Sequence, residues 1–169
     1  MSLKPEASVD AHFATETVEC VLTNDFLDAA KITQSVQDVT AGATAVFIGT
    51  TRNSFKGKTV TRLEYQAYSA IAIKTIFKIG ERALKSASRS DHQPDQSSTA
   101  VLRCAIHHRL GTVPIGEPSI VIAVSSPHRK EAFVACEEIL EEVKRKAQIW
   151  KREYYEGEDE NEAEWKANN

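Results

Sequence analysis

Short apolar runs, several of them alternating with polar residues, predict that this chain contains a β-sheet. Residues 18–22, 101–110 and 119–125 are strongly apolar, and residues 43–50 (ATAVFIGT) are β-branched and aliphatic enough to predict a buried strand. Residues 60–68 alternate apolar and charged side chains, which is typical of a strand with one buried face. Two segments rich in polar residues, glycine or proline are expected to be loops or turns: residues 51–58 and 111–118.

Three other segments have features of amphipathic helices. Asp25 is a suitable N-cap for a short helix over residues 26–36. Residues 69–86 form an apolar stripe that also contains Gly80, which costs a helix about 1 kcal/mol relative to alanine. The apolar residues of that stripe are Ile73, Ile76, Phe77 and Leu84.

The third helix is predicted from Ser126 and Pro127 to about residue 147, because serine is a good N-cap and proline is favoured at the first helical position. An irregular C-terminal end follows it. The mixture of hairpin-like strand pairs and helices indicates an α+β fold rather than a doubly wound parallel sheet. The buried stripe of this helix is expected to consist of Phe133, Cys136, Leu140 and Val143.

The length of 169 residues fits one domain, placed at residues 1–155, followed by an acidic tail at residues 156–169. The net charge of −3 hides this division, because the tail holds six acidic residues and one lysine. The remaining chain has 18 acidic and 20 basic residues, a net charge of +2. Residues 87–99 are poor in hydrophobic residues and are expected to form a mobile loop.

Several features point to a cytosolic protein that does not associate with membranes. The N-terminus lacks the apolar core of a signal peptide, and apolar runs such as residues 120–124 are too short to span a bilayer. The chain has three cysteines, an odd number, and their spacing is not that of metal ligands. They are expected to be reduced thiols packed in the interior: Cys20, Cys104 and Cys136.

Common ligand-binding motifs are missing. The sequence has no phosphate-cradling glycine motif and no nucleophile elbow. His107 and His108 would point to opposite faces of a strand, and Cys104 does not complete a zinc set, so no metal site is expected. Basic residues are not interleaved with aromatic ones, so nucleic-acid binding is not expected either.

Two segments could bind an anion. Arg52, in GTTRN after a predicted strand, could present a planar fork to a phosphate or carboxylate, or be an ordinary surface arginine. His128 and Arg129 lie near the expected start of the long helix, where free N–H groups favour anions. Cations at this end call for a compensating anion, although a well-capped helix with incidental basic residues fits equally well.

A third segment, KRKAQIWKRE at residues 144–153, is densely basic. Lys144 and Lys151 are seven positions apart, so both could face one direction if the helix nearly persisted. Clustered cations disfavour one another's protonation, and a neutral lysine can act as a nucleophile or a proton acceptor. The alternative is a basic helix end that favours the helix dipole.

In order and spacing, these pieces resemble the large-subunit family of molybdopterin synthase. The resemblance runs from about residue 42 to residue 153 and is carried by GATAVFIGTTRN, LEYQAY, HHRLGTVPIGEPSIVIAVSSPHR and KAQIWKREYYEG. The ending EAEWKAN is also similar to the family's C-terminal segment. The resemblance implies an α/β hammerhead fold with an additional small antiparallel β subdomain.

The resemblance also implies a sulfurtransferase and its partners. Enzymes of this family move sulfur from the C-terminal Gly-Gly thiocarboxylate of a small ubiquitin-like subunit to cyclic pyranopterin monophosphate. The product is the dithiolene of molybdopterin, made during molybdenum cofactor biosynthesis. Two large subunits form a central homodimer, with a small subunit at each end of the heterotetramer. No cofactor is expected, and no cysteine of this chain is required, because the partner brings the sulfur.

Carried over by position, the resemblance implies that two lysines are catalytic and that neighbouring residues bind the substrate. Lys144 would contact the partner's C-terminal carbonyl, and Lys151 would be the second essential lysine. The implied substrate-binding residues are Arg52, His128, Arg129, Lys144, Lys151, Arg152 and Glu153.

The chain departs from the family pattern in three places. Gln148 stands where proline is common, the linker around residues 87–98 is longer than usual, and the acidic tail is distinctive. Two other functions stay open on the sequence: a non-catalytic module that docks a ubiquitin-like tail or a phosphorylated pterin, and a phosphate-ligand sensor. The sensor would use Arg52, His128 and Arg129.

Overall fold

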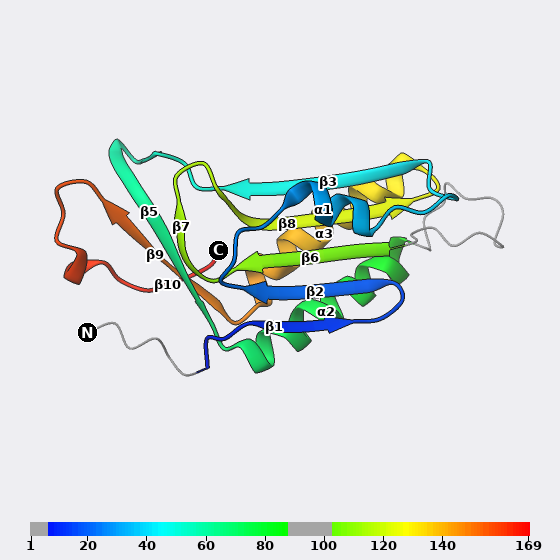
Figure 1. The fold of residues 1–169 in the computed structure, drawn as a ribbon, viewed down its shortest axis with the longest axis horizontal. Helices are drawn as coiled ribbons and strands as arrows, with labels where there is room; N and C mark the ends of the chain where they lie inside the picture. The colour runs from blue at the N-terminus through cyan, green and yellow to red at the C-terminus, as the bar shows by residue number, and fades with distance from the viewer. Residues whose placement is uncertain (1–6, 88–102) are drawn as a thin grey trace.

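The computed structural model describes residues 7–87 and 103–169, and its main feature is a five-stranded sheet (Figure 1). The strand order is β1-β2-β6-β8-β3, in which β2 and β6 are parallel and the other neighbours antiparallel. The strands are β1 (Ala11–Ala14), β2 (Val18–Thr23), β6 (Arg103–Arg109), β8 (Pro118–Ser126) and β3 (Ala43–Thr50). The apolar runs therefore predicted four of these strands, and β1 was not foreseen.

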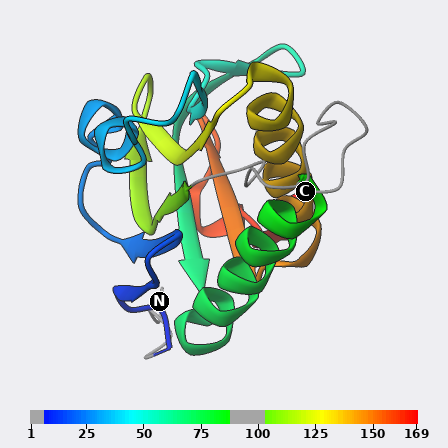
Figure 2. The same cartoon turned by 90° about the vertical axis from the view of Figure 1, so that its right-hand side faces the viewer.

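Helices cover both faces of this sheet (Figure 2). Helices α2 (Ser69–Ala87) and α3 (Arg129–Lys146) lie side by side on one face, and α1 (Ala29–Ser35) lies on the other. The core between α2, α3 and the sheet holds fully buried aliphatic side chains, each contributing about 1.5–3 kcal/mol by leaving water. They include Leu22, Ile76, Ile106, Ile122 and Ile139.

Gly80 allows α2 to lie close to the sheet. A Cβ atom at this position would lie 3.0 Å from Val18 Cγ1 and 3.2 Å from Ile106 Cδ1. The residue that weakens the helix by its propensity is therefore the one that permits close packing. The predicted apolar stripe of α2 is confirmed at Ile73 and Ile76, which are buried.

A second, antiparallel sheet crosses one end of the first at a steep angle (Figure 1). Its order is β10-β9-β5-β4, and β7 also pairs with β5. The strands are β10 (Lys166–Ala167), β9 (Ile149–Tyr155), β5 (Lys58–Ala67), β4 (Ser54–Phe55) and β7 (Gly111–Pro114). The α+β class and the additional antiparallel β unit expected from the sequence are confirmed.

Strand β3 is less buried than its sequence predicted. Val46 and Ile48 keep 38% and 46% of their surface exposed, because β3 is the edge strand of the first sheet. The short helix α1 leaves these two side chains largely uncovered. A run of β-branched residues indicates a strand, but not how much of it is covered.

The starts of two helices differ from the prediction. Helix α1 begins at Ala29, with Asp28 rather than Asp25 as N-cap; the Asp28 carboxylate accepts a hydrogen bond from the Lys31 amide at 3.2 Å. Helix α3 begins at Arg129 with His128 as N-cap, because Ser126 still belongs to β8.

The buried stripe of α3 also differs in part. Phe133, expected in the core, is 67% exposed, whereas Cys136 and Val143 are buried as predicted. The remaining buried apolar residues of α3 are Ala132, Ala135 and Ile139. Small residues let α3 approach the sheet, while the large ring of Phe133 lies outside that contact.

Three segments expected to be loops or irregular contain strands. Residues 111–114 form β7 and residues 54–55 form β4, and the end of the chain forms β9 and β10 around the short 3₁₀ helix η1 (Glu160–Glu162). The predicted mobile loop at residues 87–99 falls outside the described residues, apart from Ala87 at the end of α2. Within the described ranges, no helix is both long and apolar enough to cross a membrane.

Residues 156–169 lie against the second sheet. Lys58 Nζ is 2.6 Å from Glu158 Oε1, and Arg62 Nη1 is 2.8 Å from Glu160 Oε1. These ion pairs connect the acidic segment to β5, so part of its negative charge is matched by specific cations rather than by solvent alone.

Candidate active site

A cavity of about 220 Å³ lies where the second sheet meets the end of the first. Its walls come from β3, β5, β6, β8, β9, the end of α3 and the C-terminal residues. The cavity combines apolar walls with ionisable and hydrogen-bonding groups. Those groups include Arg52, Tyr65, His108, Lys144, Lys151 and Glu153.

Lys144 and Lys151 share this cavity, although the continuous helix that would have aligned them is absent. Helix α3 ends at Lys146, the backbone of Ala147 is extended, and β9 begins at Ile149. The helix thus ends between the two lysines, so Lys144 comes from a helix and Lys151 from a strand.

Strand pairing explains why Lys151 and Glu153 enter the same cavity. Lys151 pairs with Tyr65 and Glu153 with Leu63 on the neighbouring strand β5, and all four side chains line the cavity. Residues two apart on a strand share a face, so Arg152 between them belongs to the other face.

A short chain of polar contacts fixes the β9 groups. Lys151 Nζ lies 3.6 Å from Glu153 Oε1, and the Tyr155 hydroxyl donates a hydrogen bond to Glu153 Oε2. Burial, and then the Glu153 carboxylate, raise the pKa of Tyr155 to about 12, so the phenol stays protonated. Tyr155 therefore holds Glu153, and Glu153 holds Lys151 at the cavity wall.

Arg152 does not line the cavity. Its Nε donates to the carbonyl oxygen of Ala163 at 2.8 Å, and its guanidinium lies 5.4 Å from the ring centroid of Trp165. Arg152 therefore anchors the C-terminal segment, which differs from the substrate contact expected for it.

Arg52 does line the cavity, immediately beyond the end of β3. The backbone around it is held by two hydrogen bonds, from the Thr51 amide to Glu117 O at 3.2 Å and from the Gly116 amide to Thr51 O at 2.9 Å. These bonds tie the loop after β3 to the turn before β8 and place the guanidinium on the same side as the two lysines.

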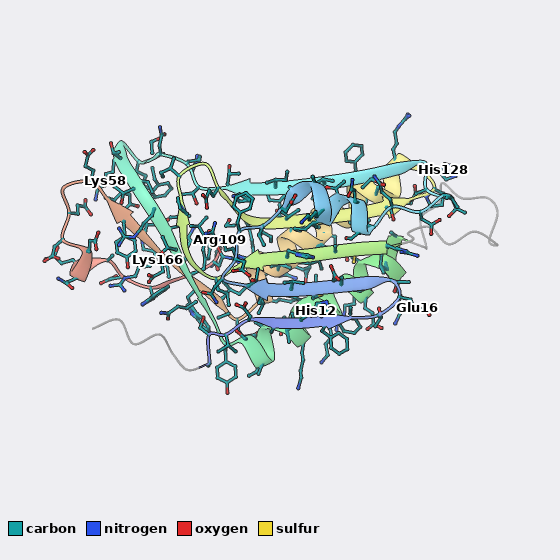
Figure 3. The ribbon with its side chains drawn as sticks, viewed as in Figure 1. His12, Glu16, Lys58, Arg109, His128 and Lys166 are labelled. Atoms are coloured by element: carbon teal, nitrogen blue, oxygen red, sulfur yellow. The ribbon has the colours of Figure 1, made fainter. Side chains whose placement is uncertain are left out.

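His128 and Arg129 lie at the opposite end of the molecule (Figure 3). Strand β8 begins at Pro118, with Ser119 lining the cavity, and ends at Ser126, two residues before His128. Its length separates the two ends by roughly 25 Å at about 3.3 Å per residue. One chain thus brings Arg52, Lys144 and Lys151 together but leaves His128 and Arg129 apart.

His108 belongs to the cavity, and the sequence analysis weighed it only as a metal ligand. Its side chain is 1% exposed, and its ring packs edge-on against Tyr65 with centroids 4.9 Å apart. Burial lowers the pKa of His108 to about 4, so the imidazole is neutral near pH 7. The signal that could have identified it is its strand position, since His108 shares a face with Cys104 and Ile106.

The cysteines contribute no reactive thiolate. Cys20, Cys104 and Cys136 are free and buried, and burial raises the pKa of Cys104 to about 12 and that of Cys136 to about 11. In the part of the chain that the structure describes, no three histidine, cysteine or acidic side chains are grouped to hold a metal ion. The polar chemistry of the cavity therefore belongs to its basic residues, Glu153, Tyr65 and His108.

Comparisons with known proteins show which proteins this chain is similar to. Residues 22–146 match the family described as MoaE protein. The molybdopterin synthase catalytic subunit of Phaeosphaeria nodorum is 47% identical over 154 residues, covering 91% of this chain and 74% of that protein.

Two solved structures share the fold. A molybdopterin synthase structure from Staphylococcus aureus has a TM-score of 0.72 and 30% identity, covering 86% of this chain and 94% of that one. A complex of subunits 1 and 2 of molybdopterin-converting factor from Helicobacter pylori has a TM-score of 0.61. Its identity is 22%, with coverage of 83% of this chain and 86% of that one, so it supports the fold alone.

Proposed function

Because this chain belongs to the MoaE protein family and is the catalytic subunit of a molybdopterin synthase, we propose that its cavity joins a sulfur-donor tail to a pterin phosphate. The observation that carries this proposal is the convergence of Arg52, Lys144, Lys151 and Glu153 on one cavity. These residues come from three separate segments of the chain, so they lie close together only when the chain is folded.

The sulfur donor is the C-terminal Gly-Gly thiocarboxylate of a small ubiquitin-like subunit. The Helicobacter pylori structure of the same fold is a complex of subunits 1 and 2 of molybdopterin-converting factor, and we propose a two-subunit assembly for this chain as well. A thiocarboxylate is an anion, and a lysine ammonium in a partly apolar cavity binds it more strongly than in water. Lys144 takes this role, at the C-terminal end of α3.

The acceptor is cyclic pyranopterin monophosphate. Arg52 provides a planar fork suited to its phosphate, and Lys151 provides a second cation that lines the same cavity. In each transfer, sulfur bonds to a pterin carbon in place of that carbon's oxygen substituent, which leaves as water or stays on the phosphate. The sulfur's bond to the tail's acyl carbon breaks, and an oxygen from water bonds to the acyl carbon, so the tail ends as a carboxylate. Two transfers build the dithiolene.

The lysines assist this exchange by charge and by proton transfer. Lys144 stabilises the negative charge that develops on the acyl oxygen while sulfur leaves. Lys151, held by Glu153, lies where it can exchange a proton with the attacked pterin.

A second copy of the chain completes the substrate site in this proposal. His128 and Arg129 cannot reach the cavity of their own chain, so they bind pterin phosphate only by entering the cavity of a neighbouring copy. This assigns a function to the homodimer expected at the centre of a heterotetramer. The cytosolic location stays a prediction from the sequence.

The proposal is tested by combining the chain with the thiocarboxylated small subunit and cyclic pyranopterin monophosphate, and measuring dithiolene product. Lys144→Ala should bind the small subunit but lose turnover. Lys146→Ala is the matched control, since Lys146 is on the same helix end but pairs with Glu142 at 2.5 Å outside the cavity. Full turnover by Lys144→Ala would instead favour a non-catalytic module that only docks the tail.

A further inference from the structure

His108 provides the cavity with a fixed hydrogen-bond acceptor that the proposed sulfur transfer does not use. Its Nδ1 lies 2.8 Å from the carbonyl oxygen of Arg109. A carbonyl can only accept, so Nδ1 carries the proton and Nε2 of the neutral ring presents a lone pair. The ring is buried and packs edge-on against Tyr65, so its orientation, and with it the position of Nε2, is fixed.

The donor that now satisfies Nε2 comes from the chain's own C-terminus. Asn168 Nδ2 lies 3.1 Å from His108 Nε2, and both Asn168 and Asn169 line the cavity. The chain end therefore occupies part of the space into which the sulfur-donor tail has to enter.

Residues 160–165 make more contacts with the rest of the protein than residues 166–169 do. Upstream, Arg152 binds the carbonyl oxygens of Glu160 and Ala163 and faces the ring of Trp165. Downstream, β10 pairs only two residues with β9, and the Asn168 amide reaches Ile149 O at 3.3 Å. Residues 166–169 are therefore held by fewer contacts than residues 160–165.

Any molecule that replaces Asn168 has to bring a donor, because a buried acceptor left without one costs about 1–3 kcal/mol. A Gly-Gly terminus has no side chains, so its donors are backbone N–H groups. We propose that His108 Nε2 accepts a hydrogen bond from a backbone N–H of the small subunit's C-terminal tail, and that Asn168 holds this position until the tail enters. This inference rests on the proposed function, because the tail belongs to that function's partner.

Binding of the small subunit, with its ordinary carboxylate terminus, tests the competition. Asn168→Ala should lower the Kd about tenfold, since it removes a competitor worth one hydrogen bond of about 1.4 kcal/mol. Asn161→Ala is the control: this residue is in the same segment, bonds Asp159 and does not line the cavity, so its Kd should equal that of the unmodified chain. An unchanged Kd for Asn168→Ala would overturn the proposal.

The role of His108 is tested by replacing it with a residue that cannot accept and with one that can. In the Asn168→Ala background, His108→Phe should raise the Kd about tenfold and so cancel the gain, because only the tail's bond to the acceptor is then lost. His108→Gln, which keeps an acceptor, should recover part of the affinity. Equal affinity of Asn168→Ala with and without His108→Phe would contradict the assignment.

Nitrogen NMR of the His108 ring gives a readout that does not depend on stability of the His108 variants. The Nε2 signal should change in Asn168→Ala and return to its hydrogen-bonded position when the small subunit is added. A return caused by cyclic pyranopterin monophosphate alone would assign the acceptor to the pterin and overturn the proposal. Absence of any small-subunit binding in the unmodified chain would refute the proposed function itself, which separates the two failures.

Discussion

At the residue scale, the sequence identified basic residues better than it identified their neighbours. The resemblance indicated Arg52, Lys144 and Lys151, and the structure places all three at one cavity. Arg152, expected to bind the substrate, instead anchors the C-terminal segment. His108, which was not expected at the site, lines the cavity. Adjacent strand residues alternate between faces, so a one-position difference decides which residue reaches the cavity, and charge patterns do not contain that information.

Glu153→Gln should slow turnover without weakening substrate binding by a similar factor. The substitution keeps the size of the side chain but removes the charge that faces Lys151 Nζ at 3.6 Å. Loss of a charge-assisted contact of about 1.4 kcal/mol corresponds to a fall of about tenfold in kcat. Steady-state dithiolene formation measures it, with Glu156→Gln as control because Glu156 lies outside the cavity. Equal kcat values for the two variants would show that Glu153 does not position Lys151.

His108 should make the protein less stable in mild acid. Its pKa is about 4 in the folded chain because of burial, whereas an unfolded histidine has a pKa of about 6.5. Between these values the unfolded state binds more protons, so stability is full above pH 6.5 and falls as the pH drops towards 4. The loss is roughly 3 kcal/mol for this residue. Burial also lowers the pKa of His107, which adds to the loss in the same direction.

Urea unfolding at pH 7.5, 5.5 and 4.5 measures this effect. Compared with the unmodified chain, His108→Gln should show a smaller loss of unfolding free energy between pH 7.5 and 4.5, because glutamine does not titrate. The same pH dependence in both proteins would assign the acid sensitivity to other groups. Glu160, whose pKa is lowered by its hydrogen bond to Arg62, responds only below its ordinary range and does not account for a loss near pH 5.5.

At the element scale, apolar patterning found the central strands and two of the three helices with nearly correct bounds. It missed β9, because residues 149–155 (IWKREYY) mix basic and aromatic side chains and continue from a basic helix end. What makes this segment a strand is its pairing with β5, a contact distant in sequence. The packing of the C-terminal segment against the second sheet was not predicted for the same reason. Its acidic run is typical of a solvated tail, and its cationic partners Lys58 and Arg62 are on the distant strand β5.

Gly42→Ala should destabilise the junction between β8 and α3. A Cβ atom at residue 42 would lie 2.4 Å from the carbonyl oxygen of Pro127, which is backbone and cannot rotate away. The Gly42 amide also donates to Ser126 O at 3.1 Å, so relief of the clash would break that bond. Overpacking of this kind costs about 1–3 kcal/mol in the free energy of unfolding.

Chemical denaturation of Gly42→Ala and Val39→Ala provides the measurement and its control. Val39 is in the same turn but fully exposed, so its replacement should change the unfolding free energy by less than about 0.5 kcal/mol. If Gly42→Ala is as stable as Val39→Ala, the close approach of residues 42 and 127 is not a constraint on the fold.

At the scale of the whole molecule, the sequence predicted the class of the fold, and the resemblance predicted its second sheet, but neither predicted that the implied site would be divided. Arg52, Lys144 and Lys151 meet at one end of β8, while His128 and Arg129 are at the other (Figure 3). A linear sequence gives the order of such residues but not the direction in which the strand between them runs relative to the cavity. Under the proposed function, this division implies that two copies cooperate, since one copy alone would leave the two cationic clusters without a common ligand.

This cooperation predicts that two inactive variants restore activity when they assemble together. Lys144→Ala disables the cavity of its own chain but can still lend Arg129 to a neighbour, and Arg129→Ala has the opposite defect. In an equal mixture that has been allowed to exchange subunits, random pairing gives one intact site in half of the dimers, or about a quarter of the unmodified turnover. Each variant alone should stay near background, and so should a mixture of Lys144→Ala with the double variant lacking both side chains. If Arg129 acted within its own chain, no mixed dimer would contain an intact site, and activity would remain at the level of the separate variants.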